Sequence, residues 1–228
     1  LVDQSTGAEW VPLAHLDPHQ APFMLYDSML SEYAALGFEY GYTIGRPDAL
    51  VAWEAQFGDF ANCAQVVIDQ FLAAADEKWD QKSRLTLLLP HGLEGQGPEH
   101  SSARLERFLQ LCARNNMRVA VPTSAAQYFH LLRSQAYLEP AAPLVVMTPK
   151  SLLRAAVAES PASAFTAGAF QRTITDPEAG PATRRLLLCS GKVAHDLLAW
   201  RAKHPSPASA VVRVEQLYPF PADEIAAL

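Results

Sequence analysis

The run from Leu89 to Arg104 (LPHGLEGQGPEHSSAR) gathers side chains suited to holding a ligand. Its glycines Gly92, Gly95 and Gly97 let the backbone approach a ligand closely, because they carry no side chain. The polar side chains of the run are His91, Glu94, Gln96, Glu99, His100, Ser101 and Arg104. We therefore predict a ligand-binding loop, although the composition alone also fits a polar loop whose serine caps the next helix.

Three other kinds of site fit this run less well. A zinc site built from His91, Glu99 and His100 would need a compact ligand spacing, and theirs matches no such motif. A phosphate-binding P-loop would continue with Gly-Lys-Ser or Gly-Lys-Thr, which does not follow. A hydrolase nucleophile would lie in Gly-x-Ser-x-Gly, which the chain lacks. The sequence therefore predicts no metal ligand in this loop.

A second cluster lies in the run LSEYAALGFEYGY, which is predicted to be helical. Glu32 stands near the helix start, where the helix dipole favours a carboxylate. Gly37 and Gly41 are four residues apart and so share a face, which suits close packing against another backbone. From spacing alone, the role of Glu32 is to complement the dipole.

A third cluster is the run Trp53–Phe60 (WEAQFGDF), which follows a predicted strand. It places Gln56, Phe57 and Phe60 at the entrance of a helix. Aromatic side chains in such a place usually belong to the core, so spacing alone gives them a structural role.

The elements around these clusters alternate between short apolar runs and segments of helical period. Strands are expected at 50–53, 85–89, 117–121 and 144–147. A helix after the first strand has the face Ala64, Val67, Ile68, Phe71 and Leu72, and one after the second has the face Leu105, Phe108, Leu109 and Cys112. A third helix opens at Ser124 with Gln127 in a capping-box pattern. Strands that alternate with helices predict an α/β fold with a doubly wound, mostly parallel sheet.

The chain changes character after about residue 154. Residues 155–183 are rich in Ala, Ser, Pro and Thr and are expected to form a surface linker. Residues 184–228 then begin a second α/β domain, with strands at 186–189 and 211–214, a helix at 193–203 and another helix from Pro221 onward. The chain starts without Met and stops within this last helix pattern, so we expect both ends to be cut.

Composition excludes several classes of protein. Acidic residues outnumber basic ones, 24 to 18, and no basic block stands out, which argues against a nucleic-acid surface. The apolar runs are far shorter than the ~20 residues of a membrane helix. Cys63, Cys112 and Cys189 are far apart and are expected to be buried free thiols.

The three clusters together resemble the thiamine-diphosphate-dependent 2-oxoglutarate dehydrogenases, the decarboxylating and succinyl-transferring components. The resemblance continues through PLVVMTPKSLLR (143–154), CSGK (189–192) and RVEQLYPFP (213–221), and it covers nearly the whole chain apart from the linker. At position 33 the chain has Tyr, where many members carry a second Glu. In this position the chain resembles the actinobacterial 2-oxoglutarate decarboxylases. The resemblance implies that residues 1–154 form the pyrimidine-binding domain of a transketolase-like fold and that 184–228 begin its C-terminal domain.

The resemblance also implies roles for single residues. Glu32 matches the glutamate that hydrogen-bonds the aminopyrimidine ring of thiamine diphosphate and so promotes loss of the thiazolium proton. Gln56, Phe57 and Phe60 match residues that border this ring, Phe60 by stacking. His100 matches a histidine that faces the substrate, and His91 is a further catalytic candidate for the same cavity.

The chain departs from the family pattern in two respects. Cys63 stands where the family usually has Gly, so that helix start is expected to pack differently. The family motif that holds the diphosphate through Mg²⁺ is absent, and Gly58-Asp59 is only a chance echo of it. The resemblance therefore implies that Mg²⁺ is held by a domain outside this chain, that a second subunit completes a homodimer, and that this chain alone is inactive.

The implied function is oxidative decarboxylation of 2-oxoglutarate, in the tricarboxylic acid cycle, with succinyl transfer to the lipoyl groups of a partner succinyltransferase. The protein would then be cytoplasmic in a bacterium or reside in a mitochondrial matrix. The alternatives are a related thiamine enzyme that acts on 2-oxoadipate or performs carboligation, and a non-catalytic binding module.

Overall fold

The computed structural model describes residues 1–94 and 97–228, so Gly95 and Gln96 of the predicted ligand loop lie outside the described residues. The chain divides into two compact units, Leu1–Leu30 and Ser31–Leu228. Within the first unit, Val2 and Glu9 form an antiparallel bridge, and a 3-10 turn, η1, spans Pro12–Ala14. All other elements belong to the second unit.

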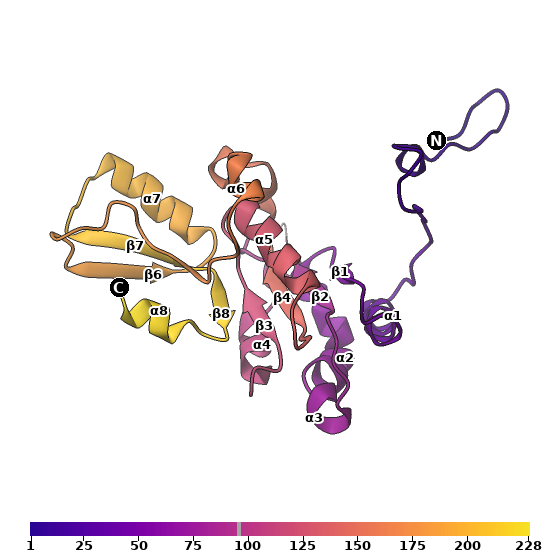
Figure 1. The fold of residues 1–228 in the computed structure, drawn as a ribbon, viewed down its shortest axis with the longest axis horizontal. Helices are drawn as coiled ribbons and strands as arrows, with labels where there is room; N and C mark the ends of the chain where they lie inside the picture. Colours follow the sequence, from indigo (N-terminus) through magenta and orange to yellow (C-terminus); the bar gives the residue numbers. More distant parts are fainter. Residues whose placement is uncertain (95–96) are drawn as a thin grey trace. The chain divides into compact units, whose positions relative to one another are not determined.

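The main sheet of the second unit has five strands in the order β1-β2-β4-β3-β8 (Figure 1). These strands are β1 (Ala52–Glu54), β2 (Thr86–Leu89), β3 (Arg118–Ala120), β4 (Leu144–Met147) and β8 (Gln216–Tyr218). The first four run parallel, and β8 is antiparallel to β3. The predicted α/β fold with a mostly parallel sheet is therefore confirmed. The strands β2 and β4 are apolar almost throughout because both faces of a central parallel strand are covered.

Helices and short helical turns connect the strands. The α-helices are α1 (Glu32–Gly45), α2 (Gln65–Val67), α3 (Ala75–Trp79), α4 (Leu105–Leu111), α5 (Ala125–Ala136), α6 (Ser163–Thr166), α7 (Val193–Lys203) and α8 (Ala222–Ala226). The other turns are η2 (Gly58–Ala64), η4 (Pro98–His100), η5 (Lys150–Arg154) and η6 (Ala156–Ala158), together with the π-helical η3 (Ile68–Leu72). The apolar face predicted for 64–72 is confirmed, although η2, α2 and η3 change hydrogen-bond pattern along it.

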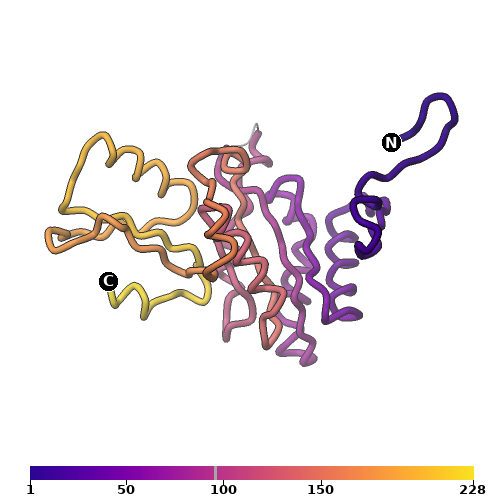
Figure 2. The backbone as a smooth tube through the Cα atoms, turned by 45° about the horizontal axis from the view of Figure 1, so that its top comes forward, coloured from indigo at the N-terminus to yellow at the C-terminus, as the bar shows by residue number. Residues whose placement is uncertain are grey.

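A smaller sheet has the order β5-β7-β6, formed by β5 (Thr173–Ile174), β6 (Arg185–Cys189) and β7 (Ser209–Val214). The segment expected to be a linker therefore contains the short helix α6 and the strand β5, which pairs antiparallel with β7. The strands β6 and β7 are parallel and α7 connects them. After β7 the chain returns to the main sheet as β8, which can be followed in the yellow part of the tube in Figure 2.

The contacts of α4 and α5 differ from the sequence predictions. In α4, Phe108 is buried but Leu109 is exposed, so Leu109 is not part of the core. At the start of α5, the Ser124 hydroxyl accepts a hydrogen bond from the Gln127 amide. The Gln127 side chain does not return to Ser124, because it donates to the Gln171 carbonyl at 2.7 Å and accepts from the Gln171 amide at 3.1 Å. The predicted capping box is therefore only half formed.

Two expectations about small side chains are also wrong. A Cβ atom at Gly37 would only touch a methyl group of Val67, at 4.0 Å, and one at Gly41 would meet nothing within 4 Å. These glycines therefore do not bring another backbone close to α1. All three cysteines are free thiols, but Cys63 is exposed and the other two are only partly buried.

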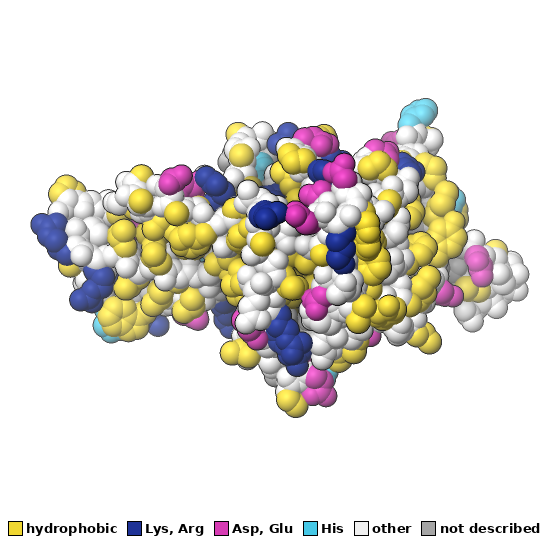
Figure 3. All heavy atoms as spheres, turned by 90° about the horizontal axis from the view of Figure 1, so that it is seen from below, with side chains coloured by type: hydrophobic (Ala, Val, Ile, Leu, Met, Phe, Trp, Pro, Cys, Tyr) yellow, Lys and Arg dark blue, Asp and Glu magenta, His cyan; other side chains and the backbone are white. Residues whose placement is uncertain are grey.

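The surface mixes all kinds of side chain. Figure 3 shows acidic and basic groups interspersed among hydrophobic ones on the face it presents. Among the described residues, no helix is both long enough and apolar enough to cross a membrane.

Candidate functional site

The candidate site lies at the carboxyl edge of the main sheet. Parallel strands end at the same edge, so the segments that follow β1, β2, β3 and β4 meet there. Backbone hydrogen bonds hold two of these segments together, because the amide of Thr148 donates to Leu89 and the amide of His91 donates to Thr148. Topology therefore brings the Trp53–Phe60 and Leu89–Arg104 clusters together.

Three rings form the centre of this edge. The His100 ring meets Phe57 edge to face, with centroids 4.3 Å apart, and meets Phe60 with centroids 5.8 Å apart. Phe57 and Phe60 also lie edge to face at 6.1 Å. The His100 Nδ1 atom is buried and has no hydrogen-bond partner among the described residues. An aromatic wall around an unpaired ring nitrogen suits contact with a ligand, because buried polar atoms in proteins are nearly always paired.

His91 lines a cavity of about 290 Å³ together with Phe57 and His100. Its Nδ1 accepts a hydrogen bond from the Ala103 amide at 3.0 Å. Burial lowers the pKa of His91, although the carboxylates of Glu106 and Asp59 act in the opposite direction. The ring is therefore neutral near pH 7 and carries its proton on Nε2, which leaves a hydrogen-bond donor.

Asp59 holds the loop that carries His100. Its carboxylate is buried and accepts hydrogen bonds from the amides of Ser101, at 3.2 Å, and Ser102, at 3.1 Å. It also forms an ion pair with Arg104 at 2.7 Å. Asp59 is therefore a structural anchor for the loop and not only a chance echo of a metal motif. The loop enters α4 through Arg104, which has a φ of 54° and makes no capping hydrogen bond with its side chain, so the alternative of a serine cap for this helix is wrong.

Gly58 allows the same loop to approach. A Cβ atom there would lie 2.4 Å from the Ala103 side chain and 2.6 Å from the Pro90 carbonyl oxygen. Real Cβ atoms do not come this close, so glycine is required for the turn after β1 and the loop after β2 to touch.

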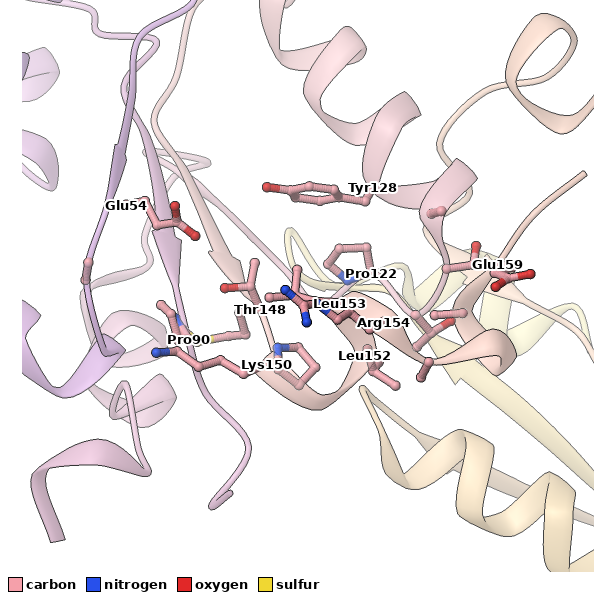
Figure 4. Close-up of a pocket in the computed structure, with 18 of the residues that line it drawn as sticks. Glu54, Pro90, Pro122, Tyr128, Thr148, Lys150, Leu152, Leu153, Arg154 and Glu159 are labelled. Carbon is pink, nitrogen blue, oxygen red and sulfur yellow. The ribbon is translucent and has the colours of Figure 1, made fainter. Parts of the chain in front are cut away.

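A larger cavity of about 680 Å³ lies along the same edge (Figure 4). Gln56, which is exposed, lines it together with Glu54. In Figure 4 the Tyr128 ring lies across the cavity from Lys150. Lys150 lines both cavities, and its ammonium lies 3.5 Å from the centre of the Phe57 ring.

Glu32 occupies the first turn of α1. Ser31 caps this helix by accepting a hydrogen bond from the Ala34 amide at 3.1 Å. The helix packs against η2, the turn that includes Phe60. The half-buried Glu32 carboxylate makes no hydrogen bond or ion pair with the described residues.

Sequence reasoning missed the roles of two residues of this site, Asp59 and Lys150. Asp59 and its partner Arg104 are far apart in sequence, so no local pattern links them. Lys150 was visible only as part of a longer motif. Within residues 1–94 and 97–228, no cluster of three or more His, Cys, Asp or Glu side chains is placed to hold a metal ion.

The fold and this edge define an open α/β domain with two adjoining cavities at the carboxyl ends of its parallel strands. Comparison with known families gives a narrower assignment. The family described as "Transketolase, pyrimidine binding domain" matches residues 2–156, and the family described as "2-oxoglutarate dehydrogenase C-terminal" matches residues 159–228. The chain therefore belongs to the transketolase pyrimidine-binding domain family.

Individual relatives agree with this assignment. The 2-oxoglutarate dehydrogenase E1 component of Cupriavidus necator is 57% identical over 223 residues, which cover 97% of this chain and 24% of that protein. The proteins of the same name from Coxiella burnetii and Azotobacter vinelandii are 53% and 52% identical, and each match covers 99% of this chain and 24% of the relative. The chain thus spans about a quarter of the length of these curated relatives.

Proposed function

We propose that this chain forms one wall of the active site of a thiamine-diphosphate-dependent 2-oxoglutarate dehydrogenase, which decarboxylates 2-oxoglutarate and passes the succinyl group to a lipoyl group. The observation that carries the proposal is the grouping of Phe57, Phe60, His91 and His100 at one sheet edge, in a chain of the pyrimidine-binding family. The names of the relatives support the choice of substrate.

The residues present fit the aminopyrimidine part of thiamine diphosphate. The half-buried Glu32 carboxylate has no partner among the described residues, so it is available to share a proton with a ring nitrogen. Phe57 and Phe60 offer aromatic surface for stacking, and Gln56 offers an exposed amide. When bound, thiamine diphosphate supplies a nucleophilic carbon and accepts the electron pair left by decarboxylation.

The histidines suit the substrate side of the site. His91 is neutral near pH 7, so it can donate a hydrogen bond without adding charge. His100 lines the small cavity, so its imidazole can exchange a proton or a hydrogen bond with a substrate bound there. The phenylalanine rings around His100 exclude water from that contact.

Lys150 favours a substrate with a second carboxylate. Its ammonium lines the small cavity beside both histidines and makes no ion pair with an acidic side chain in the described parts of the chain. A cation at this point would attract the distal carboxylate of a dicarboxylic 2-oxo acid. This supports 2-oxoglutarate, and 2-oxoadipate is the alternative of the same class.

The proposal extends to the rest of the enzyme. Mg²⁺ and the diphosphate are assigned to a domain outside this chain, contributed across a homodimer, and the acceptor is the lipoyl-bearing succinyltransferase. Residues 1–154 and 184–228 keep the proposed division into a pyrimidine-binding domain and the start of a C-terminal domain. We assign the enzyme to the bacterial cytoplasm, because the named relatives are bacterial.

The test is a substrate comparison with the enzyme as the organism makes it. Thiamine-dependent decarboxylation should be fastest with 2-oxoglutarate and slower with 2-oxoadipate and with the monocarboxylic 2-oxobutyrate. Lys150→Met should lower kcat/KM for 2-oxoglutarate about tenfold, the size of a partly exposed charge contact, and leave 2-oxobutyrate nearly unchanged. Equal losses for both substrates would refute the role of Lys150, and a wild-type preference for another 2-oxo acid would refute the substrate assignment.

A further inference from the structure

The Glu94 side chain links the histidine loop to two other parts of the fold. Its carboxylate accepts hydrogen bonds from the Ser151 amide, at 2.9 Å, and the Ser151 hydroxyl, at 2.5 Å. It also forms an ion pair with Lys192 at 2.7 Å. Ser151 follows β4, whereas Lys192 stands directly before α7 of the smaller sheet. One carboxylate therefore joins three segments that are distant in sequence.

The turn that carries Lys192 is itself held in place. Gly191 has a φ of 71°, and a Cβ atom there would lie 3.1 Å from a methyl group of Val121, at the end of β3. In the first turn of α7, the His195 Nε2 atom lies 2.8 Å from the Thr123 carbonyl oxygen. The turn that carries Lys192 is thus packed directly onto the main sheet. The backbone of Lys192 is therefore fixed relative to the main sheet, and its side chain extends from there to Glu94.

Glu94 acts on the segment that holds His100 through the neighbouring backbone. The amides of Gly92 and Leu93 donate to the Ser101 carbonyl at 3.2 and 2.9 Å. Ser101 follows His100 directly, and its own amide is held by Asp59. The backbone that follows His100 is therefore held on one side by Asp59 and on the other by Gly92 and Leu93, which directly precede Glu94.

Burial and charge are consistent with a strong local contact. The Glu94 side chain is only 19% exposed and the Lys192 side chain 42% exposed. Burial acts to raise the pKa of Glu94, but hydrogen bonds from Lys192 and Ser151 outweigh it, so the pKa of Glu94 is lowered. The carboxylate is therefore charged at neutral pH and pairs fully with Lys192.

We propose that Glu94, Ser151 and Lys192 form a clamp through which the C-terminal part of the chain fixes the positions of His91 and His100, so that Lys192 is a positioning residue for the reaction. The clamp itself follows from the contacts, and only its effect on catalysis rests on the proposed function. The smaller sheet thereby has a part in the active site without touching the substrate.

The test uses the enzyme as the organism makes it and the variant Lys192→Gln. Lys82→Gln is the matched control, because Lys82 is 39% exposed and pairs with Asp76 and Asp80 on the surface. Amide hydrogen exchange of a peptide covering 88–104 should quicken about fivefold in Lys192→Gln, as an ion pair of this exposure allows, and stay unchanged in Lys82→Gln. Lys192→Arg should restore slow exchange, and ~1 M salt should quicken exchange in the wild type, because salt screens the pair.

The catalytic half of the proposal is read from kinetics. In Lys192→Gln, kcat for 2-oxoglutarate should fall by a similar factor with little change in KM, and Lys192→Arg should recover it. The double variant Glu94→Gln/Lys192→Gln should lose no more than Glu94→Gln alone, since both changes break one contact. Unchanged exchange in Lys192→Gln would overturn the clamp. Faster exchange with an unchanged kcat would overturn the positioning role, whereas a wild-type enzyme that ignores 2-oxoglutarate would refute the proposed function and leave the exchange result valid.

Discussion

His100 and Glu32 meet different chemical surroundings, and this difference separates their proposed roles. The His100 ring is enclosed by Phe57 and Phe60, while the half-buried Glu32 carboxylate, at a helix start, has no hydrogen-bond or ion-pair partner in the described parts of the chain. An enclosed imidazole suits contact with substrate, because a water-poor setting strengthens each hydrogen bond it makes. A free carboxylate beside a cofactor ring suits proton sharing with that ring.

A comparison of variants at these two residues tests the assignment. In the complete enzyme, Glu32→Gln should slow deuterium exchange at the thiazolium carbon of added thiamine diphosphate by ~10²–10⁴-fold, the usual size of a general acid–base contribution. His100→Ala should leave this exchange nearly intact and slow the steps after 2-oxoglutarate binds. Exchange followed by NMR measures both.

The competing structural role for Glu32 predicts another result. A carboxylate that only complements the dipole of α1 would cost ~0.3–1 kcal/mol of stability when replaced. Exchange in Glu32→Gln at the wild-type rate, with a slightly lower Tm, would therefore end the catalytic assignment.

Gly58 offers a test of the close approach that builds the site. Gly58→Ala should lower the free energy of unfolding by about 1–3 kcal/mol, because the new methyl group would overlap Ala103 and the Pro90 carbonyl. The matched control is Gly41→Ala, where a Cβ atom meets nothing within 4 Å on the exposed side of α1. This change should raise stability by about 0.5–1 kcal/mol, since alanine favours a helix. Urea unfolding of both variants measures the difference, and equal effects would contradict the tight contact at Gly58.

At the scale of elements, Asp176 joins the three parts of the smaller sheet. Its side chain is fully buried, forms an ion pair with Arg201 of α7 and accepts a hydrogen bond from the Val211 amide of β7 at 2.7 Å. Burial acts to raise the pKa of Asp176, but the hydrogen bonds from Arg201, Val211 and Glu178 outweigh it, so the pKa lies below its ordinary value of 3.8. The folded state therefore stabilises the charged form of Asp176.

The sign of the shift gives a pH-dependent prediction. Since the folded pKa of Asp176 is lowered, its contribution is fully present above the unfolded value near 3.8 and is lost as pH falls through the folded pKa. Asp176→Asn should cost about 3 kcal/mol at pH 7, because it leaves the largely buried Arg201 with only the exposed Glu178 as an ion-pair partner. Thermal unfolding from pH 7 to acid should show the wild type and Asp176→Asn converging at low pH. A constant difference across this range would show that the ion pair is not the cause.

At the scale of the whole molecule, the described residues include the proposed surfaces for the aminopyrimidine and the substrate but no cluster of metal ligands. We therefore expect the 228-residue chain by itself to bind thiamine diphosphate weakly and to have no decarboxylase activity. Binding of the diphosphate through Mg²⁺ should contribute most of the cofactor's binding energy, and we assign the residues that hold Mg²⁺ to a domain outside this chain. Calorimetry with Mg²⁺ present measures this, and a micromolar dissociation constant would contradict the division of the site between domains.

The sequence by itself determined the four parallel strands of the main sheet and the loop that carries the histidines. Runs such as 85–89 and 144–147 are apolar because central strands are covered on both faces, so composition locates them. The parallel order of these strands then dictates that Phe57 and His100 meet at one edge. These are local signals, which a single sequence contains.

Only the tertiary structure decided which distant residues hold that loop in place. Asp59 pairs with Arg104 and Glu94 with Lys192, and elsewhere in the fold Gln127 pairs with Gln171, each across many intervening residues. Such pairs leave no periodic pattern in the sequence. The residues next to a carboxylate or an amide are the same whether or not the fold brings a distant partner to it. For the same reason, the sequence did not predict that β8 pairs with β3 in the main sheet. Backbone pairing between strands depends on the path of the chain and not on the residues of the strand alone.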